Sequence, residues 1–71
     1  MEEIKIRSPI MQFFAYEHLP EDLQEVAKPF AELAEFIEEA FTWNSECVLC
    51  LRKLLEAKDC AVRAKLFKYE I

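Results

Sequence analysis

The stretch from Asn44 to Phe67, NSECVLCLRKLLEAKDCAVRAKLF, decides the fold of this chain. It is rich in strong helix formers and contains neither Gly nor Pro, so it predicts one uninterrupted helix. At about 100° per residue, this helix carries two apolar faces roughly 135° apart. The first face consists of Val48, Leu51, Leu55, Val62 and Leu66, and the second of Cys50, Leu54, Ala57, Ala61 and Ala64. One partner helix covers only one face, so the sequence predicts contacts on two sides.

The size of the chain indicates how the second face is used. A single domain of 71 residues has a marginal core unless something reinforces it. Disulfides are not expected, because three cysteines is an odd number and no signal peptide precedes them. We therefore expect a homo-oligomer, with the five small or medium residues of the second face as the subunit interface.

The preceding residues complete an all-α architecture. We expect an extended arm over residues 1–18, a helix over 19–42 that is kinked near Pro29, and the second helix over 45–67, in one domain of residues 1–71. Asn44 or Ser45 is the expected N-cap of the second helix. The two helices form an antiparallel hairpin that oligomerises through the second helix. The expected apolar stripe of the first helix is Leu23, Val26, Phe30, Leu33, Ile37 and Ala40.

Charge is distributed unevenly along the chain, whose net charge is −5. Residues 21–44 carry one base against seven acids, a net charge of −6, and residues 45–71 carry six bases against four acids, a net charge of +2. Opposite charges favour packing of the two helices on each other, and the absence of a basic face argues against binding to duplex nucleic acid. The composition also argues against a membrane span, so we expect a soluble, cytoplasmic protein.

Neither catalysis nor metal binding is expected. The chain has one His and no Gly, it pairs no nucleophile with a base, and two helices do not enclose an active site. The motif Cys47-x-x-Cys50, with His18 or Cys60, lacks the second close pair of ligands that structural zinc sites use. We therefore expect no enzyme, no metal and no cofactor.

Two features leave alternatives open. Lys58 projects into the apolar arc of the second helix, where an ammonium group must extend to solvent, meet a carboxylate or bind an anionic ligand. The acidic arc of the first helix is either a solvated face or a surface that mimics nucleic acid and occupies a basic groove. That arc consists of Glu25, Glu32, Glu35, Glu38 and Glu39.

Three segments carry a resemblance to a known family. They are YEHLP with Leu23 and Gln24, then FAELA at 30–34, then LRKLLEAKDCAVRA at 51–64. They resemble the small bacteriophage helical-hairpin proteins, a family that includes the anti-CBASS and anti-Thoeris sponges. The resemblance implies an oligomer of hairpins that captures a cyclic nucleotide immune signal at a subunit interface, without turnover, in the cytoplasm of an infected bacterium.

Such a site needs stacking surfaces and phosphate donors. The residues that we expect to supply them are Phe14, Tyr16, His18, Trp43, Arg52, Lys58 and Arg63. The aromatic residues also have a structural interpretation as packing, and Arg52 and Arg63 as part of a solvated charge ladder. For Lys58 the structural interpretation is an ammonium group that extends to solvent. The alternative function is a protein-directed inhibitor or adaptor, anti-CRISPR-like or DNA-mimicking, that acts through the acidic arc. A ligand-free structural assembly is a third reading.

Overall fold

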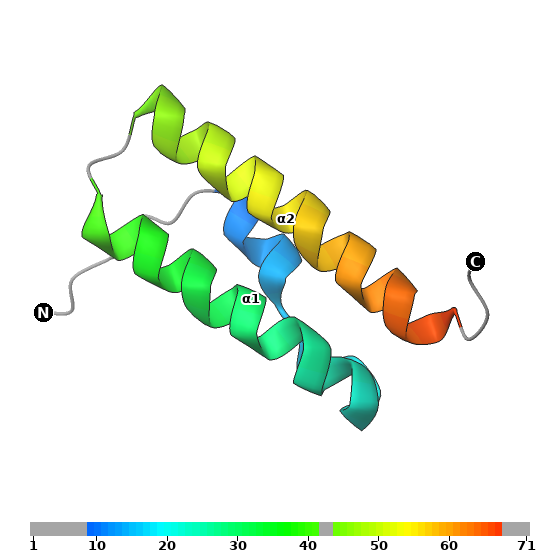
Figure 1. Cartoon of the computed structure of the whole chain (residues 1–71). Helices are drawn as coiled ribbons and strands as arrows, with labels where there is room; N and C mark the ends of the chain where they lie inside the picture. The colour runs from blue at the N-terminus through cyan, green and yellow to red at the C-terminus, as the bar shows by residue number, and fades with distance from the viewer. Residues whose placement is uncertain (1–8, 42–43, 68–71) are drawn as a thin grey trace, which may run out of the picture.

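The structure is a computed structural model that describes residues 9–41 and 44–67. These residues form a short 3-10 helix, η1 (Pro9–Phe14), and two long helices, α1 (Glu21–Ala40) and α2 (Ser45–Leu66), with no strand among them. The expected all-helical class, with two long helices packed together, is confirmed. In Figure 1 the end of α1 and the start of α2 lie at the same end of the molecule. Residues 1–8 of the arm expected over 1–18, and Trp43 in the turn, fall outside the described residues. Residues 9–14 of that arm form η1 and are not extended, because Met11 and Phe14 pack into the core.

Local sequence explains where the two long helices begin. Pro20 occupies the N-cap position of α1, and Glu21 and Asp22 follow in its first turn, where carboxylates favour the helix dipole. At α2 the predicted cap is confirmed, because Asn44 Oδ1 accepts a hydrogen bond from the Cys47 N–H at 2.8 Å. α1 continues through Pro29 as one helix, and the kink expected there stays a prediction.

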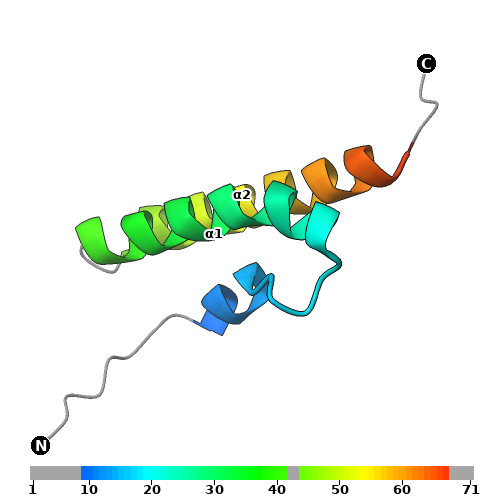
Figure 2. The same cartoon turned by 90° about the horizontal axis from the view of Figure 1, so that it is seen from below.

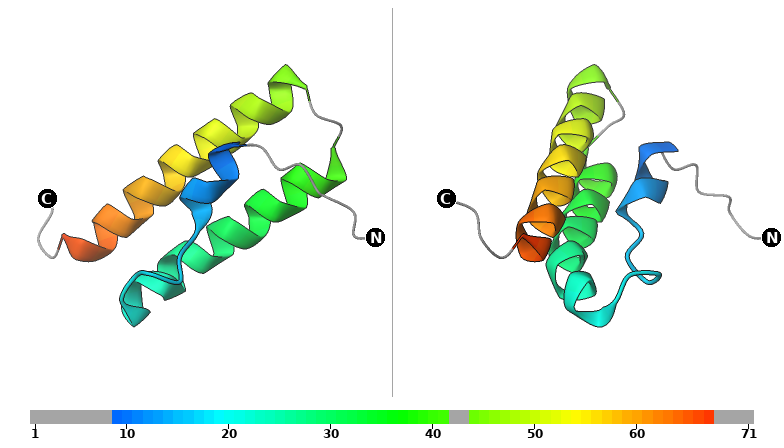
Figure 3. Two further views of the ribbon diagram at one scale, coloured as in Figure 1. Left: turned by 180° about the vertical axis from the view of Figure 1, so that it is seen from behind. Right: turned by 90° about the vertical axis from the view of Figure 1, so that its right-hand side faces the viewer.

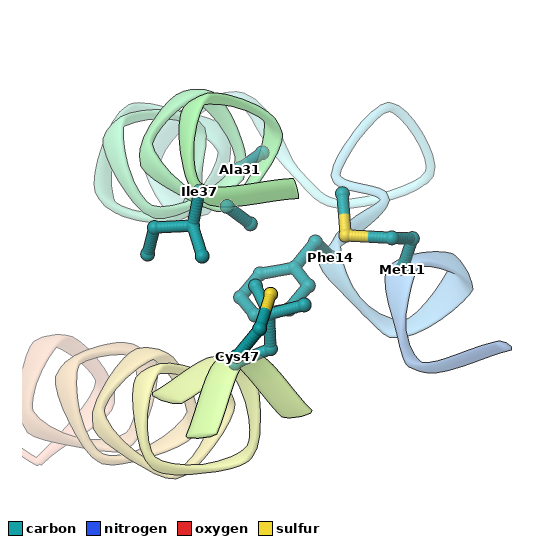
Figure 4. Packing of buried hydrophobic residues seen from close by; sticks show 7 residues of the cluster. Met11, Phe14, Ala31, Ile37 and Cys47 are labelled. Carbon is teal, nitrogen blue, oxygen red and sulfur yellow. The ribbon is translucent and has the colours of Figure 1, made fainter. Parts of the chain in front are cut away.

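A hydrophobic core cluster lies where η1, α1 and α2 meet (Figure 4). A 3-10 helix repeats every three residues, so Met11 and Phe14 of η1 share one side and both are buried. Figure 4 shows the Phe14 ring between α1 and α2. Leu51 of α2 is fully buried in the same cluster.

The buried stripe of α1 differs from the expected one. Its buried residues are Leu23, Ala27, Ala31, Ala34 and Ile37. Leu33, which we expected in the core, is 46% exposed. The reason is that α1 packs against η1 as well as α2, and the contact with η1 rotates the buried side of α1 towards its alanines.

The η1 segment covers one face of the layer that α1 and α2 form (Figures 2 and 3). No described element covers the opposite face of this layer, and the molecule is 16 Å across its smallest dimension. Neither described helix is both long and apolar enough to cross a lipid bilayer.

Candidate ligand-binding hollow between η1 and α2

A surface hollow of about 360 Å³ lies between the η1 region and the C-terminal half of α2. It is bordered on one side by η1 and the connection to α1, and on the other by successive turns of α2. Its lining residues are Gln12, Phe13, Ala15, His18, Leu19, Lys58, Asp59, Val62 and Arg63. The hollow therefore combines an aromatic ring, two basic side chains of α2, the His18 imidazole and one carboxylate.

Lys58 supplies the most enclosed charge of this hollow. Its side chain is only 12% exposed, and its Nζ lies 3.2 Å from Asp59 Oδ1. Of the alternatives that the sequence left open, the structure shows the carboxylate partner. An ammonium group has three N–H donors, so the contact with Asp59 leaves Lys58 able to donate to a further acceptor in the hollow.

Arg63 lies one turn further along α2 and is exposed. Its Nη2–H donates to Cys60 Sγ at 3.3 Å, which helps to hold the guanidinium beside the helix. Arg63 also lines a second hollow of about 240 Å³, together with Cys60, Ala64 and Phe67. It therefore connects the first hollow to the small-residue side of α2.

His18 lies in the connection between η1 and α1, which hydrogen bonds fix in place. The Gln24 Nε2–H donates to the carbonyl oxygens of Leu19 at 2.9 Å and Glu17 at 3.3 Å. The backbone on both sides of His18 is thus tied to the first turn of α1, and His18 lines the hollow opposite α2.

Of the two adjacent phenylalanines of η1, the structure places Phe13 at the hollow and not Phe14. Phe14, which we expected as a stacking surface, is 2% exposed and belongs to the core, so its ring is not available to a ligand in this structure. Phe13 is 58% exposed and lines the hollow. Sequence reasoning missed Phe13 and Gln12, and the signal that identifies them is the three-residue repeat that follows Pro9.

Two other residues that we expected to contact a ligand, Tyr16 and Arg52, do not line this hollow. Tyr16 is half-buried and packs against the core cluster. Arg52 is exposed on α2 but is not among the lining residues, and Trp43 lies outside the described residues. Of the seven residues that we expected to contact a ligand, the structure therefore brings together His18, Lys58 and Arg63.

The expected subunit interface is accessible along α2. Cys50, Ala57 and Ala64 are exposed, and Leu54 and Ala61 are half-buried. All three cysteines are free, with Cys47 buried and Cys60 exposed like Cys50. Within the described part of the chain, no group of three or more His, Cys, Asp or Glu side chains is placed to hold a metal ion.

The fold and the hollow define a small all-helical protein with a charged, partly aromatic surface site. Comparison of the chain with protein-family models, with curated proteins and with solved structures found no match.

Proposed function

We propose that this protein acts by binding, without turnover, and that its ligand is a cyclic nucleotide immune signal. In this proposal it is a phage anti-defence sponge that sequesters a cyclic oligonucleotide or a cyclic ADP-ribose isomer in the cytoplasm of the infected host. The observation that carries the proposal is the hollow between η1 and α2. It gathers Lys58, Arg63 and His18 beside an exposed aromatic ring in a chain whose net charge is −5.

The chemistry of the lining suits a nucleotide. The exposed ring of Phe13 offers a flat surface on which a base stacks. Lys58 and Arg63 supply charge-assisted hydrogen bonds to phosphate oxygens, and Arg63 is able to donate two in parallel. The lining residues include no serine, threonine or cysteine that His18 would activate, which favours capture over cleavage.

The size of the hollow supports a role for a second subunit. Its volume of about 360 Å³ lies near the lower end of the range of about 300–1,000 Å³ for ligand pockets. We propose that antiparallel hairpins assemble through α2 and complete the site. Arg63 supports this arrangement, because it borders both the hollow and the small-residue side of α2.

Isothermal titration calorimetry tests the proposal. The titrants are cyclic dinucleotides, cyclic trinucleotides and cyclic ADP-ribose isomers, and we expect tight binding of at least one. Lys58→Met, which keeps most of the apolar stem, should weaken that binding about tenfold to a hundredfold, the effect of losing a hydrogen bond to a charged group.

Lys65→Met is the matched control, since Lys65 is an exposed cation of α2 outside the hollow. It should bind like the wild type. Absence of heat across the whole panel would reject the proposed function. Equal binding by Lys58→Met and Lys65→Met would show that the ligand does not bind in the hollow.

A second candidate function is a protein-directed inhibitor or adaptor that acts through the acidic arc of α1. The observation that favours it is that Leu33 and Phe36 are 46% and 59% exposed, beside the exposed Glu32. Apolar side chains next to carboxylates are typical of a surface that binds a basic protein groove.

Charge reversal separates the two functions. Changing Glu32, Glu35 and Glu39 to lysine should abolish binding to a protein target but leave cyclic nucleotide binding intact, because none of these residues lines the hollow. Loss of nucleotide binding in this triple variant would show that the acidic arc and the hollow do not act as separate sites.

A further inference from the structure

The face of the α1/α2 layer that points away from η1 carries exposed apolar residues on both helices. Ala31 marks the side of α1 that faces η1, because it lines a hollow together with Met11 and Phe14 of η1. Leu33 and Phe36 lie about 140–160° around the helix from Ala31. They therefore lie on the side of α1 that η1 does not cover. Figures 2 and 3 show η1 on one face of the α1/α2 layer.

The same reasoning places the small residues of α2. Val62 lines the hollow beside η1, and Ala57 lies about 140° around the helix from Val62. Cys50 lies within about 20° of Ala57 and is exposed as well. Both helices thus contribute exposed residues to the face of the layer that points away from η1. We call it the open face and define it by Leu33, Phe36, Cys50 and Ala57.

The side chains that α1 and α2 contribute to the open face differ in size. α1 contributes bulky side chains, and the Phe36 ring is braced edge-to-face against Phe41, with the ring centroids 6.4 Å apart. α2 contributes short side chains, which let another backbone approach closely. A surface with large residues on one helix and small ones on its neighbour is complementary to itself after a two-fold rotation.

Charge selects the same arrangement. α1 carries one base against seven acids, a net charge of −6, and α2 carries five bases against three acids, a net charge of +2. Placing α1 of one copy on α1 of another would oppose two strongly acidic helices. Placing α1 on the partner's α2 pairs opposite charges twice in one two-fold contact.

We propose that the open face is occupied by a second copy of this chain, in a two-fold dimer with α1 of each copy on α2 of the other. This extends the subunit contact from α2 alone to α1. Arg63 borders both the small-residue side of α2 and the hollow, so the hollow of each copy lies at the edge of this contact. The inference rests on the open face and not on the cyclic nucleotide proposal, and a measurement of mass without any ligand tests it.

Light scattering after size-exclusion chromatography tests the dimer. The wild-type chain should elute at twice its mass of 8.4 kDa. Phe36→Glu on α1 and Ala57→Glu on α2 should each convert it to a monomer, because each buries a charge in the apolar contact. Circular dichroism should show that both variants keep their helices, since both positions are exposed within one copy.

Phe13→Glu is the matched control, because Phe13 is as exposed as Phe36 but lies on η1. It should remain dimeric. A monomeric wild type at submillimolar concentration would overturn the proposal and assign the open face to a different partner. Dissociation by Ala57→Glu but not by Phe36→Glu would overturn it too, since the contact would then use α2 alone.

Discussion

Ala27, Ala31 and Ala34 determine how closely α1 lies to its neighbours. They are 1%, 7% and 0% exposed, so each methyl group fills the space between α1 and the elements beside it. Protein cores are packed about as densely as organic crystals, and a larger side chain at such a position has no room. These three alanines are therefore as much a part of the fold as the large residues of the core.

A substitution at Ala34 tests this close contact. Ala34→Leu should lower the free energy of unfolding by about 1–3 kcal/mol, because the extra atoms force α1 away from α2 and η1. Urea denaturation measures the change. Ala40→Leu is the control, since Ala40 is exposed on the same helix, and it should change stability by less than about 0.5 kcal/mol. Equal effects at the two positions would contradict the close packing.

At the scale of elements, η1 is a structural part of the core and a wall of the hollow at once. Its inward residues, Met11 and Phe14, join the core cluster. Its outward residues, Gln12 and Phe13, line the hollow. The short 3-10 helix thus couples the stability of the protein to the shape of the candidate site.

Adjacent phenylalanines separate these two roles. Phe14→Ala should cost about 3–5 kcal/mol of stability, a large part of the total of about 4–10 kcal/mol expected for a chain of this length. Phe13→Ala should cost much less, because Phe13 is 58% exposed. It should instead weaken ligand binding through the lost stacking surface. Thermal melts and calorimetry measure both effects. A stability loss at Phe13 as large as that at Phe14 would show that both rings are structural.

At the scale of the whole molecule, η1, α1 and α2 enclose a core on one side of the α1/α2 layer, and no described element covers the other side. A core of this size is marginal by itself, and assembly is one of the ways in which small domains gain stability. The exposed Leu33 and Phe36 are explained if a second copy covers them.

Assembly makes thermal stability depend on concentration. If the folded state is a dimer and the unfolded state is not, the Tm of the wild type should rise as the protein concentration is raised about a hundredfold. Differential scanning calorimetry measures this shift. Phe36→Glu should melt at a Tm that does not change with concentration. A wild-type Tm that is likewise independent of concentration would contradict the dimer.

The sequence by itself determined the features that depend on neighbours along the chain. The unbroken run of helix formers predicted α2, and the short polar side chain of Asn44 predicted its cap. Helical periodicity placed Lys58 inside the apolar arc of α2 but left its partner open, and the structure shows its side chain 12% exposed beside Asp59. Local geometry suffices for such inferences, since it fixes which residues share one side of a helix.

Only the tertiary structure decided which side faces inward. The apolar residues of α1 extend over more than half of its circumference, so periodicity alone allowed either the stripe through Leu33 or the one through Ala34. The position of η1 selected the alanine side, and the same packing buried Phe14 and turned Phe13 towards the hollow. The physical reason is that burial depends on where a third element docks, and that contact joins segments that the sequence separates by more than fifteen residues.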